Sequence, residues 1–132
     1  MAYLIDTDTI VFALRGEESV LAKFEENKQI PISISMITYA ELVFGAIRSQ
    51  NEQKNMILVN HIRDIYQIEQ LSEGVMEVFA SIKAKLFESG SRIEDMDLMI
   101  AATALYNDLT LVTNNTKHFE KIPNLKLENW KQ

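Results

Sequence analysis

The chain has 132 residues and carries 13 Lys+Arg against 19 Asp+Glu, which gives a formal net charge of −6. It is 47% hydrophobic with 4 glycines and 2 prolines, a composition typical of one ordinary globular domain rather than of a disordered chain. The absence of cysteine excludes disulfide scaffolds, thiol catalysis and cysteine zinc sites. No apolar run approaches the roughly 20 residues of a membrane span, and no basic region precedes the first apolar stretch, so we expect a cytoplasmic protein that does not enter the membrane.

Apolar strands alternate with helical stretches along the whole chain. The predicted strands are 2–5, 30–35, 66–71, 109–112 and 125–130. The predicted helices are 10–14 with Asp8 as its cap, 17–27, 37–49, 52–63, 73–88, and one opened by the capping-box spacing of Ser91 and Glu94 that frays around Asn107. This alternation predicts one α/β domain over residues 1–132, with a central, mostly parallel sheet of about four to five strands flanked by helices.

Asp6 ends the first predicted strand. Ligands of parallel sheets bind at the carboxyl ends of strands, so this carboxylate is a candidate functional group. The alternative is that Asp6 caps the next helix, but Asp8 is better placed for that task.

Two further acids lie on apolar helical faces. Glu41 has Ile37 and Phe44 as helical neighbours, where a carboxylate is costly unless it is paired; an ion pair with Arg48 is the structural alternative. Asp97 stands beside small and apolar residues near a helix start, where the dipole favours its ionised form. Its structural alternative is a buried acid satisfied by backbone donors, whereas Asp95 faces elsewhere and is expected to be solvated.

These three carboxylates come from distant segments, and two of the predicted strands end in polar residues, at Asp6 and Thr113. Oxygen ligands with open positions suit Mg²⁺ or Mn²⁺. Such ions activate water and stabilise the leaving oxygen in phosphodiester hydrolysis. No serine or cysteine nucleophile with a base is evident, so water is the expected attacking group.

Four segments, LIDTDTI, TYAELVFG, DLMIAATAL and LVTNNTKHF, resemble in order and spacing a PIN domain, and the likeness covers essentially the whole chain, including the LKLENW tail. The chain looks most like the VapC-type toxins of bacterial type II toxin–antitoxin pairs. This resemblance implies a metal-dependent endoribonuclease that blocks translation, with initiator tRNA as a candidate substrate. It implies that Asp6, Glu41 and Asp97 hold Mg²⁺ or Mn²⁺, and that Thr7, Thr113 and Asn115 support the site.

Two positions depart from the family pattern. Relatives commonly have DTN where this chain has Asp6-Thr7-Asp8, which adds a carboxylate. The family's fourth acid commonly falls where this chain has His118, which adds no negative charge but is able to ligate metal or contact phosphate.

The resemblance also implies partners: a VapB-type antitoxin whose C-terminal segment lies in the acidic cleft, a homodimer, and RNA. An acidic protein that binds RNA needs bound metal or a local basic patch. The candidate rim cations are Arg15, Arg48, Lys54, Lys83, Lys85 and Lys117.

Two other functions remain open at this point. The Asp6-Thr7-Asp8-Thr9 sequence also matches the opening of haloacid-dehalogenase-like phosphatases, in which the first Asp is a nucleophile and the second a general acid. Alternatively, with His118 at the fourth acidic position, the chain is a PIN-like module that binds RNA or a partner without cutting.

Overall fold

The computed structural model describes residues 1–131 of the chain. The strands are β1 (Tyr3–Ile5), β2 (Ile32–Ser35), β3 (Gln67–Glu69), β4 (Thr110–Val112) and β5 (Leu127–Glu128). The helices are α1 (Thr7–Leu14), α2 (Glu18–Glu26), α3 (Met36–Arg48), α4 (Glu52–Ile65), α5 (Glu73–Glu88), α6 (Asp95–Tyr106) and α7 (Thr116–Phe119). No helix among residues 1–131 is both long enough and apolar enough to cross a membrane.

The five strands form one sheet in the order β3-β2-β1-β4-β5, and every neighbouring pair is parallel. The predicted α/β architecture is therefore confirmed. Leu4 in the central strand pairs with Ser33 on one side and with Leu111 on the other. Because the chain leaves β1 for β2 on one side and reaches β4 on the other, the ends of β1 and β4 enclose the crevice at which such sheets bind ligands.

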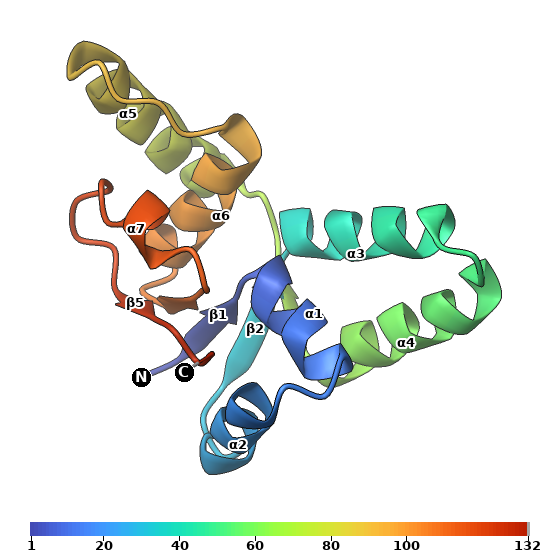
Figure 1. Cartoon of the computed structure of the whole chain (residues 1–132). Helices are drawn as coiled ribbons and strands as arrows, with labels where there is room; N and C mark the ends of the chain where they lie inside the picture. The colour runs from blue at the N-terminus through green and yellow to red at the C-terminus, as the bar shows by residue number, and fades with distance from the viewer. Residues whose placement is uncertain (132) are drawn as a thin grey trace.

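Two apolar cores cover the two faces of the sheet, because successive side chains of a strand point to opposite faces. Leu4 lies in the core beneath α5 and α6, and Tyr3 and Ile5 lie in the core shared with α1 to α4. Figure 1 shows the resulting shape: the α5–α6 pair and the α3–α4 pair diverge from the sheet, with α1 beginning between them.

Two predicted helix caps are wrong. The first helix begins at Thr7, so Asp6 rather than Asp8 is its N-cap, and the Asp6 side chain accepts a hydrogen bond from the backbone N–H of Thr7. The helix around Asp97 begins at Asp95, and the predicted capping box does not form. Its Ser91 is already engaged in ending α5: the backbone N–H of Ser91 donates to Leu86 O at 2.9 Å, with Gly90 at φ +76° as the left-handed residue before it.

The C-terminal tail closes one of the two cores. Trp130 is 1% exposed, and its ring lies edge-on to the rings of Tyr3 and Phe24. The distances between ring centroids are 5.2 Å to Tyr3 and 4.9 Å to Phe24. Its indole Nε1–H donates to Glu128 Oε1 at 3.0 Å, so the one polar atom of the ring is satisfied inside the fold.

Trp130→Ala is therefore expected to lower the free energy of unfolding by about 3–5 kcal/mol, the usual cost of emptying a buried aromatic site. Urea denaturation followed by circular dichroism measures this change. Phe87→Ala is the matched control, because Phe87 is 81% exposed and its removal is expected to change stability by no more than about 0.5 kcal/mol. Equal effects of the two substitutions contradict the packing described for the tail.

Candidate active site

Asp6 and Thr113 meet where β1 and β4 end. Asp6 is 8% exposed, and Thr113, 107 positions away in sequence, is fully buried. Thr113 Oγ1 donates to Asp6 Oδ2 at 2.8 Å, and the backbone N–H of Thr7 donates to Asp6 Oδ1 at 2.8 Å. Both carboxylate oxygens thus have a fixed donor, and the predicted convergence of the two strand ends is confirmed.

Glu41 joins this group through Thr7. The Thr7 hydroxyl donates to Glu41 Oε1 at 2.5 Å and lies 3.1 Å from Thr38 Oγ1. The ion pair with Arg48 does not form. The predicted apolar stripe around Glu41 is correct on one side only, because Ile37 is buried but Phe44 is 63% exposed.

Asp97 lies in the first turn of α6, with His118 as its partner. His118 Nε2 is 3.1 Å from Asp97 Oδ2, and the two side chains are 25% and 35% exposed. The residue at the family's fourth acidic position therefore does reach the predicted site. Asp95, two positions earlier, forms an exposed ion pair with Lys83 at 2.9 Å, which agrees with its predicted solvation.

Asp8 accepts hydrogen bonds that fix the loop after β4, a role that the sequence did not indicate. Its Oδ2 accepts from the backbone N–H of Asn114 at 3.0 Å and lies 3.5 Å from Thr113 Oγ1. The same hydroxyl accepts from the backbone N–H of Asn115 at 3.1 Å. Asn115 thus shapes the loop through its backbone, while its exposed side chain makes no hydrogen bond among residues 1–131. The only signal of this role in the sequence is the extra carboxylate itself.

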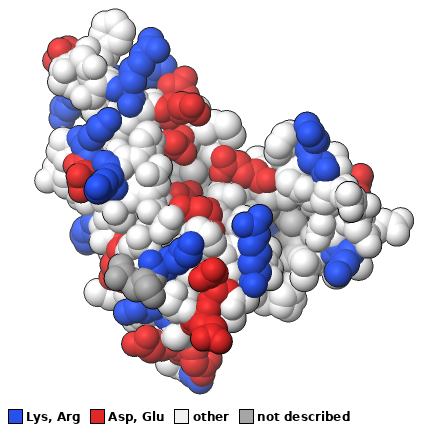
Figure 2. Space-filling model, viewed as in Figure 1, with Lys and Arg blue, Asp and Glu red and all other residues white. Residues whose placement is uncertain are grey.

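Burial raises the pKa of Asp6 to about 7, and the negative charges of Asp8 and Asp97 contribute to the rise. The hydrogen bonds from Thr113 and Thr7 oppose this rise, since they favour the ionised form. The negative charges of two other carboxylates thus act on Asp6 at this edge of the sheet. Figure 2 shows acidic side chains along the notch between the α5–α6 and α3–α4 pairs.

The donor set fits a hard divalent cation, because its members are carboxylates and a bound cation relieves the repulsion that Asp97 exerts on Asp6. Within residues 1–131, however, no three Asp, Glu or His side chains already converge closely enough to hold one. Each predicted ligand is instead bonded to a protein group: Asp6 to Thr113, Glu41 to Thr7, and Asp97 to His118. Because an ionised carboxylate has about four lone-pair sites, these bonds leave oxygen lone pairs for a cation, and cation binding requires the side chains to move closer together.

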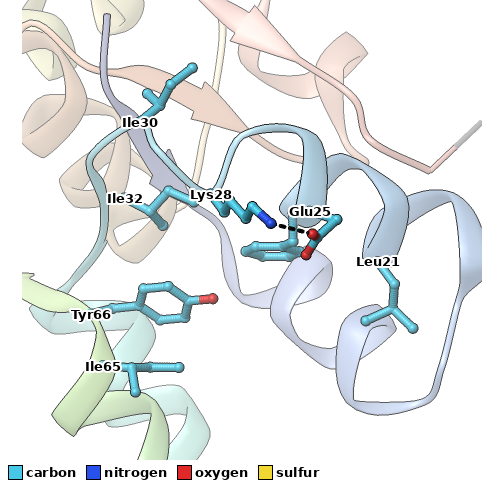
Figure 3. Close-up of a pocket in the computed structure, with 8 residues that line it drawn as sticks. Leu21, Glu25, Lys28, Ile30, Ile32, Ile65 and Tyr66 are labelled. Carbon is cyan, nitrogen blue, oxygen red and sulfur yellow. Dashed lines mark hydrogen bonds and ion pairs between the residues drawn. The ribbon is translucent and has the colours of Figure 1, made fainter.

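A separate hollow of about 420 Å³ lies between α2 and the start of β2 (Figure 3). Ile30, Ile32 and Tyr66 form much of its wall. Its two charged residues, Lys28 and Glu25, are exposed and form an ion pair with each other, with Lys28 Nζ at 2.7 Å from Glu25 Oε1. Because Ile32 is the first residue of β2, this hollow lies at the opposite edge of the sheet from Asp6.

The comparisons with known proteins agree with this architecture. The PIN domain family matches residues 3–125. The chain is 34% identical to the ribonuclease VapC2 of Rickettsia felis and 31% identical to the tRNA(fMet)-specific endonuclease VapC of Salmonella typhimurium, in each case over 98% of both chains. Its fold is similar to a chain in the crystal structure of VapBC2 from Rickettsia felis bound to a promoter DNA fragment, with a TM-score of 0.92, 33% identity, and coverage of 98% of this chain and 99% of that one.

The raised pKa of Asp6 predicts a pH dependence of stability in metal-free protein. Between the unfolded pKa near 3.8 and the folded value of about 7, the folded chain holds a proton that the unfolded chain releases. Stability is therefore lost as the pH rises through this window. The Asp6→Asn variant has no carboxyl group at this position, so it does not lose this stability. The free energy of unfolding of the variant minus that of the wild type is therefore expected to be about 2 kcal/mol larger at about pH 8 than at about pH 5. Urea unfolding of both proteins in a chelator at the two pH values tests this. A difference in unfolding free energy between variant and wild type that is the same at both pH values contradicts it.

Proposed function

The chain belongs to the PIN domain family, and from that premise we propose that it is an endoribonuclease, the toxin of a toxin–antitoxin pair that inhibits translation by cutting RNA. Its relatives named ribonuclease or tRNA(fMet)-specific endonuclease align with 98% of the chain, which favours initiator tRNA as the substrate. The observation that carries the proposal is that Asp6 and Glu41 both bond to Thr7 at the end of β1, while Asp97 is near enough to contribute to the raised pKa of Asp6.

The cofactor in this proposal is Mg²⁺ or Mn²⁺, held by the three acids at the end of the sheet. When bound, such an ion lowers the pKa of water and offsets the negative charge that develops on the phosphate. The chain's own residues position the carboxylates for this task. Thr113 and the backbone of Thr7 orient Asp6, the Thr7 hydroxyl orients Glu41, and His118 holds Asp97 at the edge of α6.

The proposed protein partner is a VapB-type antitoxin, because the similar solved structures include VapBC complexes from Rickettsia felis and Salmonella typhimurium. An acidic notch suits a basic segment of such a partner. We also propose a homodimer, for which exposed apolar side chains such as Phe44 and Ile47 on α3 offer contact area.

The phosphatase alternative is not supported. The matched family is the PIN domain, and Asp8, which that alternative needs as a general acid, accepts a hydrogen bond from the backbone N–H of Asn114. The experiments below compare the nuclease proposal with the non-catalytic alternative, a PIN-like binding module, which predicts metal and RNA binding without a cleavage product.

Asp97→Asn is expected to lower cleavage of tRNA(fMet) in Mg²⁺ or Mn²⁺ by more than about 100-fold, because removing a ligand costs more than the roughly 10–100-fold of removing a supporting partner. Sequencing of new RNA ends measures this decrease. Asp108→Asn is the matched control: Asp108 follows the other end of the same helix and is exposed, with φ +54°, a conformation that Asn tolerates. Intact RNA with the wild-type protein and confirmed metal binding favours the non-catalytic module.

His118→Asp restores the family's fourth acid and is expected to tighten Mn²⁺ binding by about 10-fold or more, since a further carboxylate faces the cation. Without metal the variant is expected to be less stable, because two carboxylates replace the contact between His118 and Asp97. Calorimetric titration with Mn²⁺ measures the affinity, and His118→Asn controls for removal of the imidazole alone. Unchanged Mn²⁺ affinity in His118→Asp contradicts a place for this residue beside the metal.

A further inference from the structure

Two hollows that share Leu86 border α5. One lies between α5 and the segment that runs from α7 towards β5, and the other lies between the end of α5, the segment before α6 and His118. The larger has a volume of about 630 Å³ and reaches His118, and the smaller has a volume of about 400 Å³; Leu86 lines both. Together we call them the α5–α7 groove. The cationic side chains that line it are Lys83, Lys85, Arg92 and Lys121.

The α5–α7 groove is a cationic region on an acidic protein. Its carboxylates are Glu94 and Asp95, and Asp95 is already paired with Lys83. The other three cationic side chains make no ion pair or side-chain hydrogen bond within residues 1–131; they are Lys85, Arg92 and Lys121. Figure 2 shows Lys and Arg side chains spread over the part of the molecule built from α5, α6 and α7.

The groove opens at the candidate active site. His118 lines its larger hollow, and the His118 Nε2 atom is 3.1 Å from Asp97 Oδ2. A strand whose cleaved phosphate lies at the acids therefore meets the larger hollow first, where Arg92 is the cation without an ion pair among residues 1–131, and the smaller hollow with Lys85 and Lys121 beyond it. We propose that the α5–α7 groove binds the phosphodiester backbone of the RNA on one side of the cut. This inference rests on the proposed nuclease function.

The lining matches an unpaired RNA strand in three ways. The free cations suit phosphates, which attract Lys and Arg without regard to sequence. Ser81 and Asn124 add a hydroxyl and an amide able to bond ribose hydroxyls. Phe87, 81% exposed at the edge of the larger hollow, offers a ring on which a base stacks.

A protein partner fits the other pair of helices better. The exposed apolar side chains Phe44, Ile47 and Ile57, at 63%, 55% and 68%, all lie on α3 and α4. Apolar area is what protein interfaces bury at their centres, whereas free cations beside an acidic catalytic site suit an anionic polymer. The charges of the groove therefore favour RNA as its occupant.

The test combines Lys85→Glu with Lys121→Glu, and the matched control combines Lys28→Glu with Arg63→Glu. All four side chains are exposed, and the control pair, which lies after α2 and on α4, is not among the candidate rim cations. Binding of a fluorescein-labelled tRNA(fMet) anticodon stem-loop is followed by anisotropy in chelator, so that no cleavage occurs. We expect the groove variant to bind about 10-fold or more weakly, and the slope of log affinity against log salt to fall by about 0.7 for each phosphate that the variant no longer neutralises.

Cleavage in Mn²⁺, measured in parallel, separates this inference from the proposed function. A higher KM for the groove variant, with a largely retained kcat, supports the groove as a binding surface. If the wild-type protein binds RNA through these lysines but does not cut it, the nuclease proposal is overturned and the groove's role in RNA binding stands. Equal RNA binding by groove and control variants overturns the inference, as does a groove variant that fails only to bind a purified antitoxin.

Discussion

The hydrogen bond between Thr113 and Asp6 joins the two strand ends on which the site depends. It exists because β1 and β4 pair in parallel, so that residues 107 positions apart leave the sheet side by side. The first turn of α1 then fixes the remaining groups: Thr7 contacts Glu41, and Asp8 holds the loop after β4. A displacement of the β1–β4 register would separate Asp6 and Asp8 from the loop after β4, so this strand pairing fixes the geometry on that side of the site.

The sequence predicted the architecture because its strands are short apolar runs and its helices have clear periodicity. It also singled out Asp6, Glu41 and Asp97, since carboxylates among apolar residues stand out from their surroundings, although Phe44 beside Glu41 proved to be exposed. Helix starts were less predictable, because Ser91 has the spacing of a cap for α6 but is used to end α5. That choice depends on the turn at Gly90, not on the spacing of Ser91 and Glu94.

Exposure and charge were predicted poorly for a different reason. Phe44 belongs to a helical stripe that periodicity assigns to a core, but α3 extends beyond the sheet and its outer end is left uncovered. The cations that share a groove come from α5, from the segment before α6 and from the segment after α7. No sequence period connects these segments, so Arg92 and Lys121 were missed, whereas Lys83 and Lys85 were among the candidates.

The place of β1 in the middle of the sheet has a consequence for synthesis. Asp6 is made 107 positions before its partner Thr113, and Trp130, which packs against Tyr3, follows later still. A growing chain therefore carries its first acid on a strand whose neighbour has not yet emerged. The contact between the ends of β1 and β4 forms only after Thr113 has left the ribosome, so assembly of the acidic centre depends on contacts distant in sequence, which form slowly.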